Sequence, residues 1–176
     1  MANNTKENES PVVATEPKET ERRQKKPVAK KVDLHEYIPV RNGFQGRLVY
    51  TSKRTGEKFV WNQYGDEQEM ELLELKNAKN SNKSFFQNNW FMFDEDWVPE
   101  YLGVKQFYRY ALPINHFDDL FEMSPNEVEE RVSKMSKGQK KSVAYRARQL
   151  ISEGGIDSIR VINALEKGLG IELTEK

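Results

Sequence analysis

Cysteine is absent from this 176-residue sequence, and histidine occurs only twice, as His35 and His116. Without cysteine the chain has no disulfide, no thiol nucleophile and no cysteine-ligated zinc or iron–sulfur site. The two histidines lie far apart in the sequence, which argues against a histidine-based metal centre or catalytic dyad. The sequence therefore predicts neither a metal site nor a cofactor.

Long apolar runs are also missing. The longest strongly apolar stretch is Trp90–Phe93, whereas crossing a bilayer as a helix takes about 20 residues. The first ten residues are polar and charged, without the apolar core of a secretory signal. We therefore expect no membrane partner and take the cytoplasm as the default compartment.

The motifs that activate a nucleophile or bind a nucleotide are absent as well. No G-x-S-x-G elbow, S-x-x-K pair, GxxxxGK[ST] loop or EF-hand spacing occurs. The acidic run Asp94–Asp96 offers oxygen ligands of the kind that Mg²⁺ and Ca²⁺ prefer, but no second acidic motif accompanies it. A run of acids before a helix start is favoured by the helix dipole, so we interpret it as helix capping and predict a protein that is not an enzyme.

Charge is balanced in total but segregated along the chain. The sequence has 28 basic and 28 acidic side chains, for a net charge of zero. Residues 1–32 are net +3, residues 66–130 are net −10, and residues 131–152 are net +7. Opposite charges in separate segments favour oriented contacts between complementary faces, including head-to-tail association of copies.

The pattern predicts one α+β domain preceded by an arm. Residues 1–32 are rich in Glu, Lys, Asn, Thr and Pro and have few large apolar side chains. Such a segment buries too little apolar surface to offset an ordering entropy of about 1–2 kcal/mol per residue, so we expect a disordered arm. The domain is expected over residues 33–176, with a sheet part at 33–95 and a helical part at 96–170.

The sheet part is expected to be a small antiparallel sheet built on a hairpin. Leu48 and Tyr50 alternate on one strand and Phe59 and Trp61 on the next, with a polar turn closed by Gly56 between them. Residues 67–80 show a helical spacing with room for a short strand at the start. Residues 90–93 are apolar on both faces, which predicts a strand inside the sheet beside the hairpin, and Asp96 is predicted to cap the following helix.

Three helices are expected in the helical part. Ser124 and Glu127 have the spacing of a capping box, and Ser136 and Gln139 repeat it. Gly154-Gly155 is expected to end the second helix, and Asp157 to cap the third. The predicted apolar faces are Val128, Val132 and Met135; Val143, Ala147, Leu150 and Ile151; and Ile159, Ile162, Leu165 and Leu169.

Two basic surfaces are candidate binding sites. The first is the solvent side of the first two of these helices, a surface for nucleic acid or an acidic partner, formed by Arg131, Lys134, Lys137, Lys140, Lys141 and Arg148. The second is the hairpin tip, where Lys53 and Arg54 could contact phosphate. Both are compositional signals, and exposed lysines and arginines often serve only solubility.

Residues 48–104 contain a distinctive arrangement of aromatic and acidic residues. Its elements are the hairpin ending in Trp61, the turn Tyr64-Gly65-Asp66, the helix start Glu69-Met70-Glu71-Leu72, the pair Phe85-Phe86, and the strand 90–93 running into Asp94-Glu95-Asp96. In this pattern the stretch resembles small virion-associated proteins of tailed bacteriophages that infect Gram-positive bacteria. No catalytic residue comes with the resemblance.

The resemblance implies a structural or assembly component of a phage particle, in the head, neck or tail. Such a protein is made in the host cytoplasm, is found in the virion, and contacts other virion proteins as part of a homo-oligomer. A 32-residue arm reaches about 100 Å if extended, enough to thread along a neighbour. The alternative hypothesis is a nucleic-acid-binding accessory or regulatory protein that uses the basic surface 131–148.

Overall fold

The computed structural model describes residues 32–174 and confirms the predicted α+β class, with 48% helix and 15% strand. The strands are β1 (Tyr37–Asn42), β2 (Leu48–Thr51), β3 (Lys58–Trp61), β4 (Glu67–Glu71) and β5 (Phe91–Met92). The helices are α1 (Leu72–Ser81), α2 (Ser84–Gln87), α3 (Trp97–Tyr101), α4 (Pro125–Lys134), α5 (Lys137–Glu153) and α6 (Ile159–Leu169), with 3₁₀ turns η1 (Lys105–Phe107), η2 (Ile114–His116) and η3 (Asp118–Glu122). The predicted arm, residues 1–32, lies outside the described part except for Val32.

The sheet differs from the prediction in its pairing. A three-stranded antiparallel sheet has the order β4-β1-β5, while β2 and β3 form a separate two-stranded sheet. The short strand β5 is therefore an edge strand that pairs with β1, and the expectation that it lies beside the hairpin is wrong. β1, where no strand was predicted, is the strand that joins the other two.

Pro39 explains why β1 is hard to recognise. Proline has no amide proton to donate and normally excludes a central strand. Here β5 pairs only with Arg41 and Asn42, so at Pro39 the strand β1 has β4 alone as a neighbour. Although β1 is the middle strand of the sheet, Pro39 has a neighbouring strand on one side only, as a residue of an edge strand does.

The hairpin is confirmed. Leu48 pairs with Trp61 and Tyr50 with Phe59, and Gly56 in the connection has φ +76°, a conformation that glycine adopts without strain. The side chains of Leu48, Tyr50 and Trp61 are buried, as the alternation predicts. The helix with a short strand at its start, predicted over 67–80, is also confirmed, because α1 begins directly after β4.

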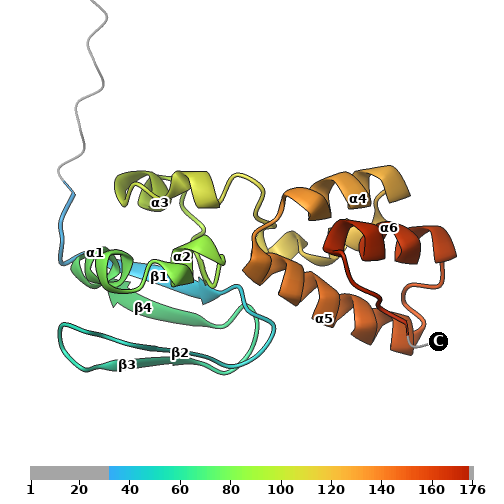
Figure 1. Ribbon diagram of the computed structural model, residues 1–176. Coiled ribbons are helices and arrows are strands. Elements are labelled where there is room, and N and C mark those ends of the chain that lie inside the picture. The colour runs from blue at the N-terminus through green and yellow to red at the C-terminus, as the bar shows by residue number, and fades with distance from the viewer. Residues whose placement is uncertain (1–31, 175–176) are drawn as a thin grey trace, which may run out of the picture. The chain divides into compact units, whose positions relative to one another are not determined.

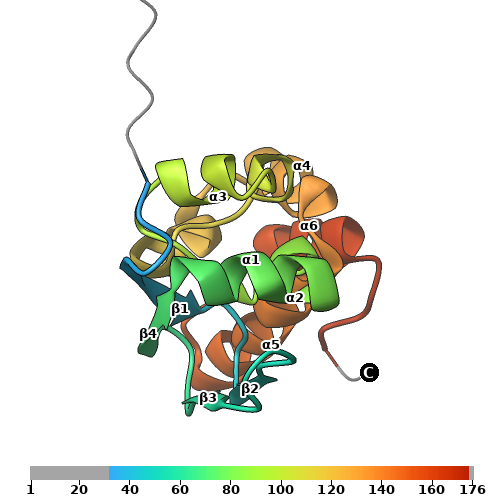
Figure 2. The same cartoon turned by 90° about the vertical axis from the view of Figure 1, so that its left-hand side faces the viewer.

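An aromatic core holds the sheet part together. Figures 1 and 2 show α1 and α2 lying against the strands, with α1 running across the strand direction, and Phe85 and Phe86 of α2 are buried. The Phe91 ring lies 4.8 Å from Phe85 and 5.5 Å from both Phe86 and Trp61, centroid to centroid. Asp96 precedes α3 as predicted, but its side chain makes no capping hydrogen bond.

The ends of α4 and α5 follow the sequence signals, and the start of α6 does not. Ser124 and Glu127 form the capping box of α4, and Ser136 Oγ accepts a bond from the Gln139 amide at 3.1 Å. Gly154 ends α5 with φ +76°. α6 is preceded by Ser158, not Asp157, and Ile159 is 72% exposed, so both its predicted cap and that part of its predicted apolar face are wrong.

A second apolar core lies among α4, α5 and α6, which Figure 1 shows as neighbouring helices. Val128, Val132, Val143, Ala147 and Leu165 are fully buried in it. One face of α5 also contacts residues outside these helices. Ser142 Oγ donates to the Gly43 carbonyl at 3.1 Å, and Gln139 bonds both backbone groups of Leu112. These buried polar contacts fix which side of α5 faces solvent.

Replacing Ser124 by alanine is expected to lower the free energy of unfolding by about 1 kcal/mol, the usual effect of losing an N-cap serine. Its hydroxyl is 2.6 Å from Glu127 Oε2, and that carboxylate also accepts from the Ser124 amide at 3.1 Å. Urea denaturation measures the change. Ser133→Ala, at an exposed site on the same helix, is the matched control and is expected to have little effect. Equal losses for the two variants would contradict the assigned cap.

Candidate binding groove on α5

The structure divides the six predicted basic residues into two groups. Lys140, Lys141 and Arg148 line one groove along α5, formed with the end of α6 and the tail that follows it. Arg131 and Lys134 lie on α4, and Lys137 is exposed in the first turn of α5; none of these three lines the groove. The basic surface is thus centred on the second helix of the predicted pair.

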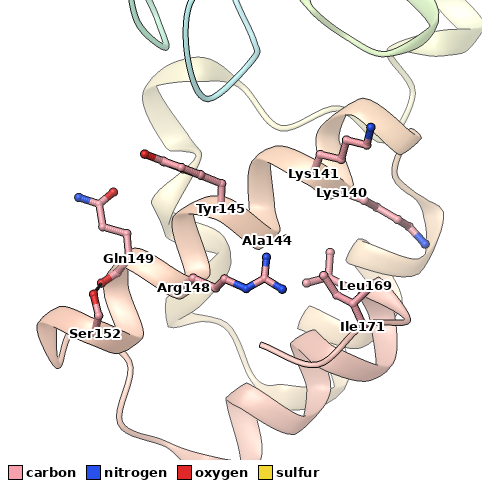
Figure 3. Close-up of a pocket in the computed structure, with 9 residues that line it drawn as sticks. All are labelled: Lys140, Lys141, Ala144, Tyr145, Arg148, Gln149, Ser152, Leu169 and Ile171. Atoms are coloured by element: carbon pink, nitrogen blue, oxygen red, sulfur yellow. Dashed lines mark hydrogen bonds between the residues drawn. The ribbon is translucent and has the colours of Figure 1, made fainter. Parts of the chain in front are cut away.

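The groove has a volume of about 670 Å³ and is lined by Lys140, Lys141, Ala144, Tyr145, Arg148, Gln149, Ser152, Leu169 and Ile171. We call this set the α5 groove. In Figure 3 the Arg148 side chain extends toward Leu169 and Ile171. Lys141, Tyr145 and Arg148 follow one another at spacings of four and three and are all exposed, so they lie along one solvent-facing side of α5.

Two of the three cations are held in place by backbone carbonyls. Lys140 Nζ donates to the Gly168 carbonyl at 3.1 Å, at the C-terminal end of α6, where a cation also suits the helix dipole. Arg148 donates to the Glu172 carbonyl at 3.0 Å. The first contact ties the end of α6 to α5, and the second ties the chain after α6 to it; neither cancels the positive charge.

The charge of the groove is not neutralised within the described residues. No ion pair of the segment 32–174 joins Lys140, Lys141 or Arg148 to a carboxylate. The neighbouring cations differ. Lys134 pairs with Glu130 at 2.6 Å, which raises the pKa of Lys134, and Arg146 pairs with Asp118 through two nitrogens, which raises the pKa of Arg146. The groove cations therefore remain available for an external anion.

Apolar side chains line the groove between these charges. Tyr145 is 61% exposed and Ile171 is 43% exposed, so both present apolar surface to solvent. Ala144 and Leu169 lie beside them. An apolar surface rimmed by charge is the usual composition of a site for protein contacts.

Tyr145, Leu169 and Ile171 were not predicted as binding-site residues from the sequence, although Leu169 was predicted on an apolar helix face. The signal for Tyr145 was present, because it lies four residues after Lys141 and two after the buried Val143, on the outward face of a predicted helix. No local signal places Leu169 and Ile171 next to α5, because that contact depends on the packing of α6.

At the hairpin tip the structure separates the two predicted contact residues. Lys53 is exposed, but Arg54 turns toward the sheet part and bonds Glu74 at 3.2 Å and Glu71 at 3.5 Å. Glu74 is 3% exposed and also accepts from the Tyr50 hydroxyl at 2.7 Å. The role that these contacts give Arg54 is to neutralise a buried carboxylate.

Glu74→Gln is expected to lower the free energy of unfolding by about 1.5–3 kcal/mol at neutral pH, the range for hydrogen bonds to charged groups. Burial alone would raise the pKa of Glu74, but hydrogen bonds led by those from Tyr50 and Ser52 outweigh it and lower the pKa. A lowered folded-state pKa stabilises the fold above the unfolded pKa of about 4.3, and this contribution is lost as the pH falls through the folded pKa.

Urea denaturation between pH 3 and pH 7 measures this effect. The difference between wild type and Glu74→Gln should shrink as the pH falls below about 4. Glu71→Gln, which alters the longer contact to Arg54, is the control and should change stability less. A difference that stays constant with pH would show that the charge of Glu74 contributes nothing.

Metal and membrane sites find no support in the described segment. Residues 32–174 contain no group of three or more histidine, aspartate or glutamate side chains placed to hold a metal ion. No helix in that part of the chain is long and apolar enough to span a membrane.

Comparison of the chain with protein-family models, curated proteins and solved structures finds no match. Within the described residues, the α5 groove is the feature whose chemistry suits a binding function.

Proposed function

We propose that this chain is a non-enzymatic structural or assembly protein of a tailed-bacteriophage particle, and that it acts through protein–protein contacts at the α5 groove. The observation that carries the proposal is an exposed apolar groove with three cations, none of which has a carboxylate partner among residues 32–174. The resemblance of residues 48–104 to phage virion proteins supports a place in the particle.

The lining of the groove favours a protein ligand over a nucleic acid. Apolar side chains of a partner fill the space beside Leu169 and Ile171, and its carboxylates meet Lys141 and Arg148. The phosphate backbone of a nucleic acid can pair with the cations but has no apolar groups to pack against Leu169 and Ile171. The expected ligand is therefore a protein segment that combines apolar and acidic residues.

Mass spectrometry of purified, nuclease-treated particles tests the proposed role. We expect peptides of this chain at a constant ratio to the major particle proteins after extensive washing. Absence of the chain from finished particles and from isolated assembly intermediates would overturn the proposal.

A second candidate function, nucleic-acid binding, is favoured by one specific observation. Tyr145 is exposed between Lys141 and Arg148, and aromatic side chains beside cations can stack on bases. This function predicts DNA or RNA binding that weakens steeply with salt and drops when Lys140, Lys141 and Arg148 are replaced by glutamate. Failure to bind either nucleic acid at low salt would dispose of it.

A further inference from the structure

We propose that the α5 groove is occupied by residues 7–16 of this chain, from the same or a neighbouring copy. The inference depends on the proposed function of the groove as a docking site for a protein segment, and it names that segment. It follows from the chemistry of the groove, the sequence of the arm and the length of chain that joins them.

The groove sets two requirements for its occupant. Ala144, Leu169 and Ile171 provide an apolar floor, so the occupant needs a short apolar stretch. Lys141 and Arg148 stand on the rim without a carboxylate partner among residues 32–174, so the stretch needs acids close to it. The groove runs along α5 beside the end of α6 and the tail that follows it, a shape that suits a narrow segment of chain.

Residues 7–16, with the sequence ENESPVVATE, meet both requirements. Val12, Val13 and Ala14 form a short apolar stretch, and Glu7, Glu9 and Glu16 flank it on both sides. The segment contains three glutamates and no lysine or arginine. Opposite charges across an interface speed the encounter and select the orientation, while the apolar residues supply the affinity.

The rest of the arm has the properties of a tether. Residues 22–31 carry six basic side chains and no acidic one, so like charge keeps them out of the groove. Residues 17–31 separate the segment from the folded part, and fifteen residues extend to about 50 Å. That exceeds the diameter of a small domain, about 30 Å, so the tether can carry the segment across a folded chain. Tethering also raises the effective concentration of the segment to the millimolar range.

Binding of a labelled peptide tests the inference. The probe is a fluorescent peptide with the sequence of residues 5–18, and the receptor is the full-length chain in two forms. In one form the arm is wild type, and in the other V12D and V13D disable the segment. Both substitutions lie outside the described residues, and circular dichroism is the check that the fold is unchanged.

We expect the peptide to bind the V12D/V13D chain and to bind the wild-type chain at least tenfold more weakly, because the wild-type groove already holds its own segment. A peptide carrying V12D/V13D should not bind either form. No binding to the V12D/V13D chain, or equal binding to both chains, would overturn the inference. A dimer that persists in the V12D/V13D chain on ultracentrifugation would also overturn it, by pointing to a folded face of a second copy. Particle mass spectrometry reports on the proposed function separately, so the two failures are distinguishable.

Discussion

Replacing Trp61 by alanine is expected to lower the free energy of unfolding by roughly 3–5 kcal/mol, the range for removing a buried aromatic side chain. Trp61 is 0% exposed, and its indole Nε1 donates to the Val40 carbonyl at 2.8 Å. It therefore joins the hairpin, which forms its own sheet, to the central strand β1. Domains of this size are stable by about 5–15 kcal/mol, so the loss is a large fraction of the total.

Urea denaturation at constant protein concentration measures this loss. Trp61→Phe keeps an aromatic ring but removes the hydrogen bond to Val40, so it should cost less than alanine. Val49→Ala lies in the same hairpin at an exposed site and is expected to stay within about 0.5 kcal/mol of wild type. A loss below 1 kcal/mol for Trp61→Ala would show that the hairpin is not held to the rest of the fold through this side chain.

Reversing two charges at the groove, Lys141→Glu together with Arg148→Glu, is expected to weaken binding of the residue 5–18 peptide about 30-fold. Each reversal turns an attraction at a solvent-exposed rim into a repulsion, a change of about 1 kcal/mol. Two such changes amount to about 2 kcal/mol, and 1.4 kcal/mol corresponds to a factor of ten in affinity. Fluorescence anisotropy with the V12D/V13D chain as receptor measures the effect.

The matched control is Lys53→Glu with Lys137→Glu. It changes the net charge by the same amount, and both positions are exposed and lie outside the groove. We expect less than a threefold effect on peptide binding. Equal weakening by the two double variants would mean that the peptide responds to net charge and does not dock at the groove.

The features predicted correctly from the sequence are those with local causes. The hairpin depends on a four-residue alternation and on Gly56, and the caps of α4 and α5 depend on Ser124 and Ser136 with the residues three positions later. Each of these signals acts between residues that are close together in the sequence. The cap of α6 was misplaced by one residue because Asp157 and Ser158 are both good cap residues and adjacent.

The features that were missed depend on contacts between distant segments. β1 gains its place from β4 and β5, which follow it by about 25 and 50 residues, and Pro39 conceals it. The candidate site shows the same division. The cations of α5 are visible in the composition, but the groove exists only because Leu169 and Ile171 pack beside that helix. Arg54 was expected at a free hairpin tip, and only the fold brings Glu74 within reach of it.

Photo-crosslinking from position 145 shows whether a protein segment docks in the α5 groove. Tyr145 lines the groove and is 61% exposed, so p-benzoylphenylalanine fits there with little change. The matched position is Ile159, which is 72% exposed on α6 and does not line the groove. The cross-link is formed in cells that assemble the particle, and the adducts are mapped by mass spectrometry.

We predict protein adducts from position 145 that map to short segments with apolar residues between acids, residues 7–16 of this chain among them. Position 159 should give none of these adducts. Adducts to nucleic acid from position 145, or the same protein adducts from both positions, would contradict docking of a protein segment in the α5 groove.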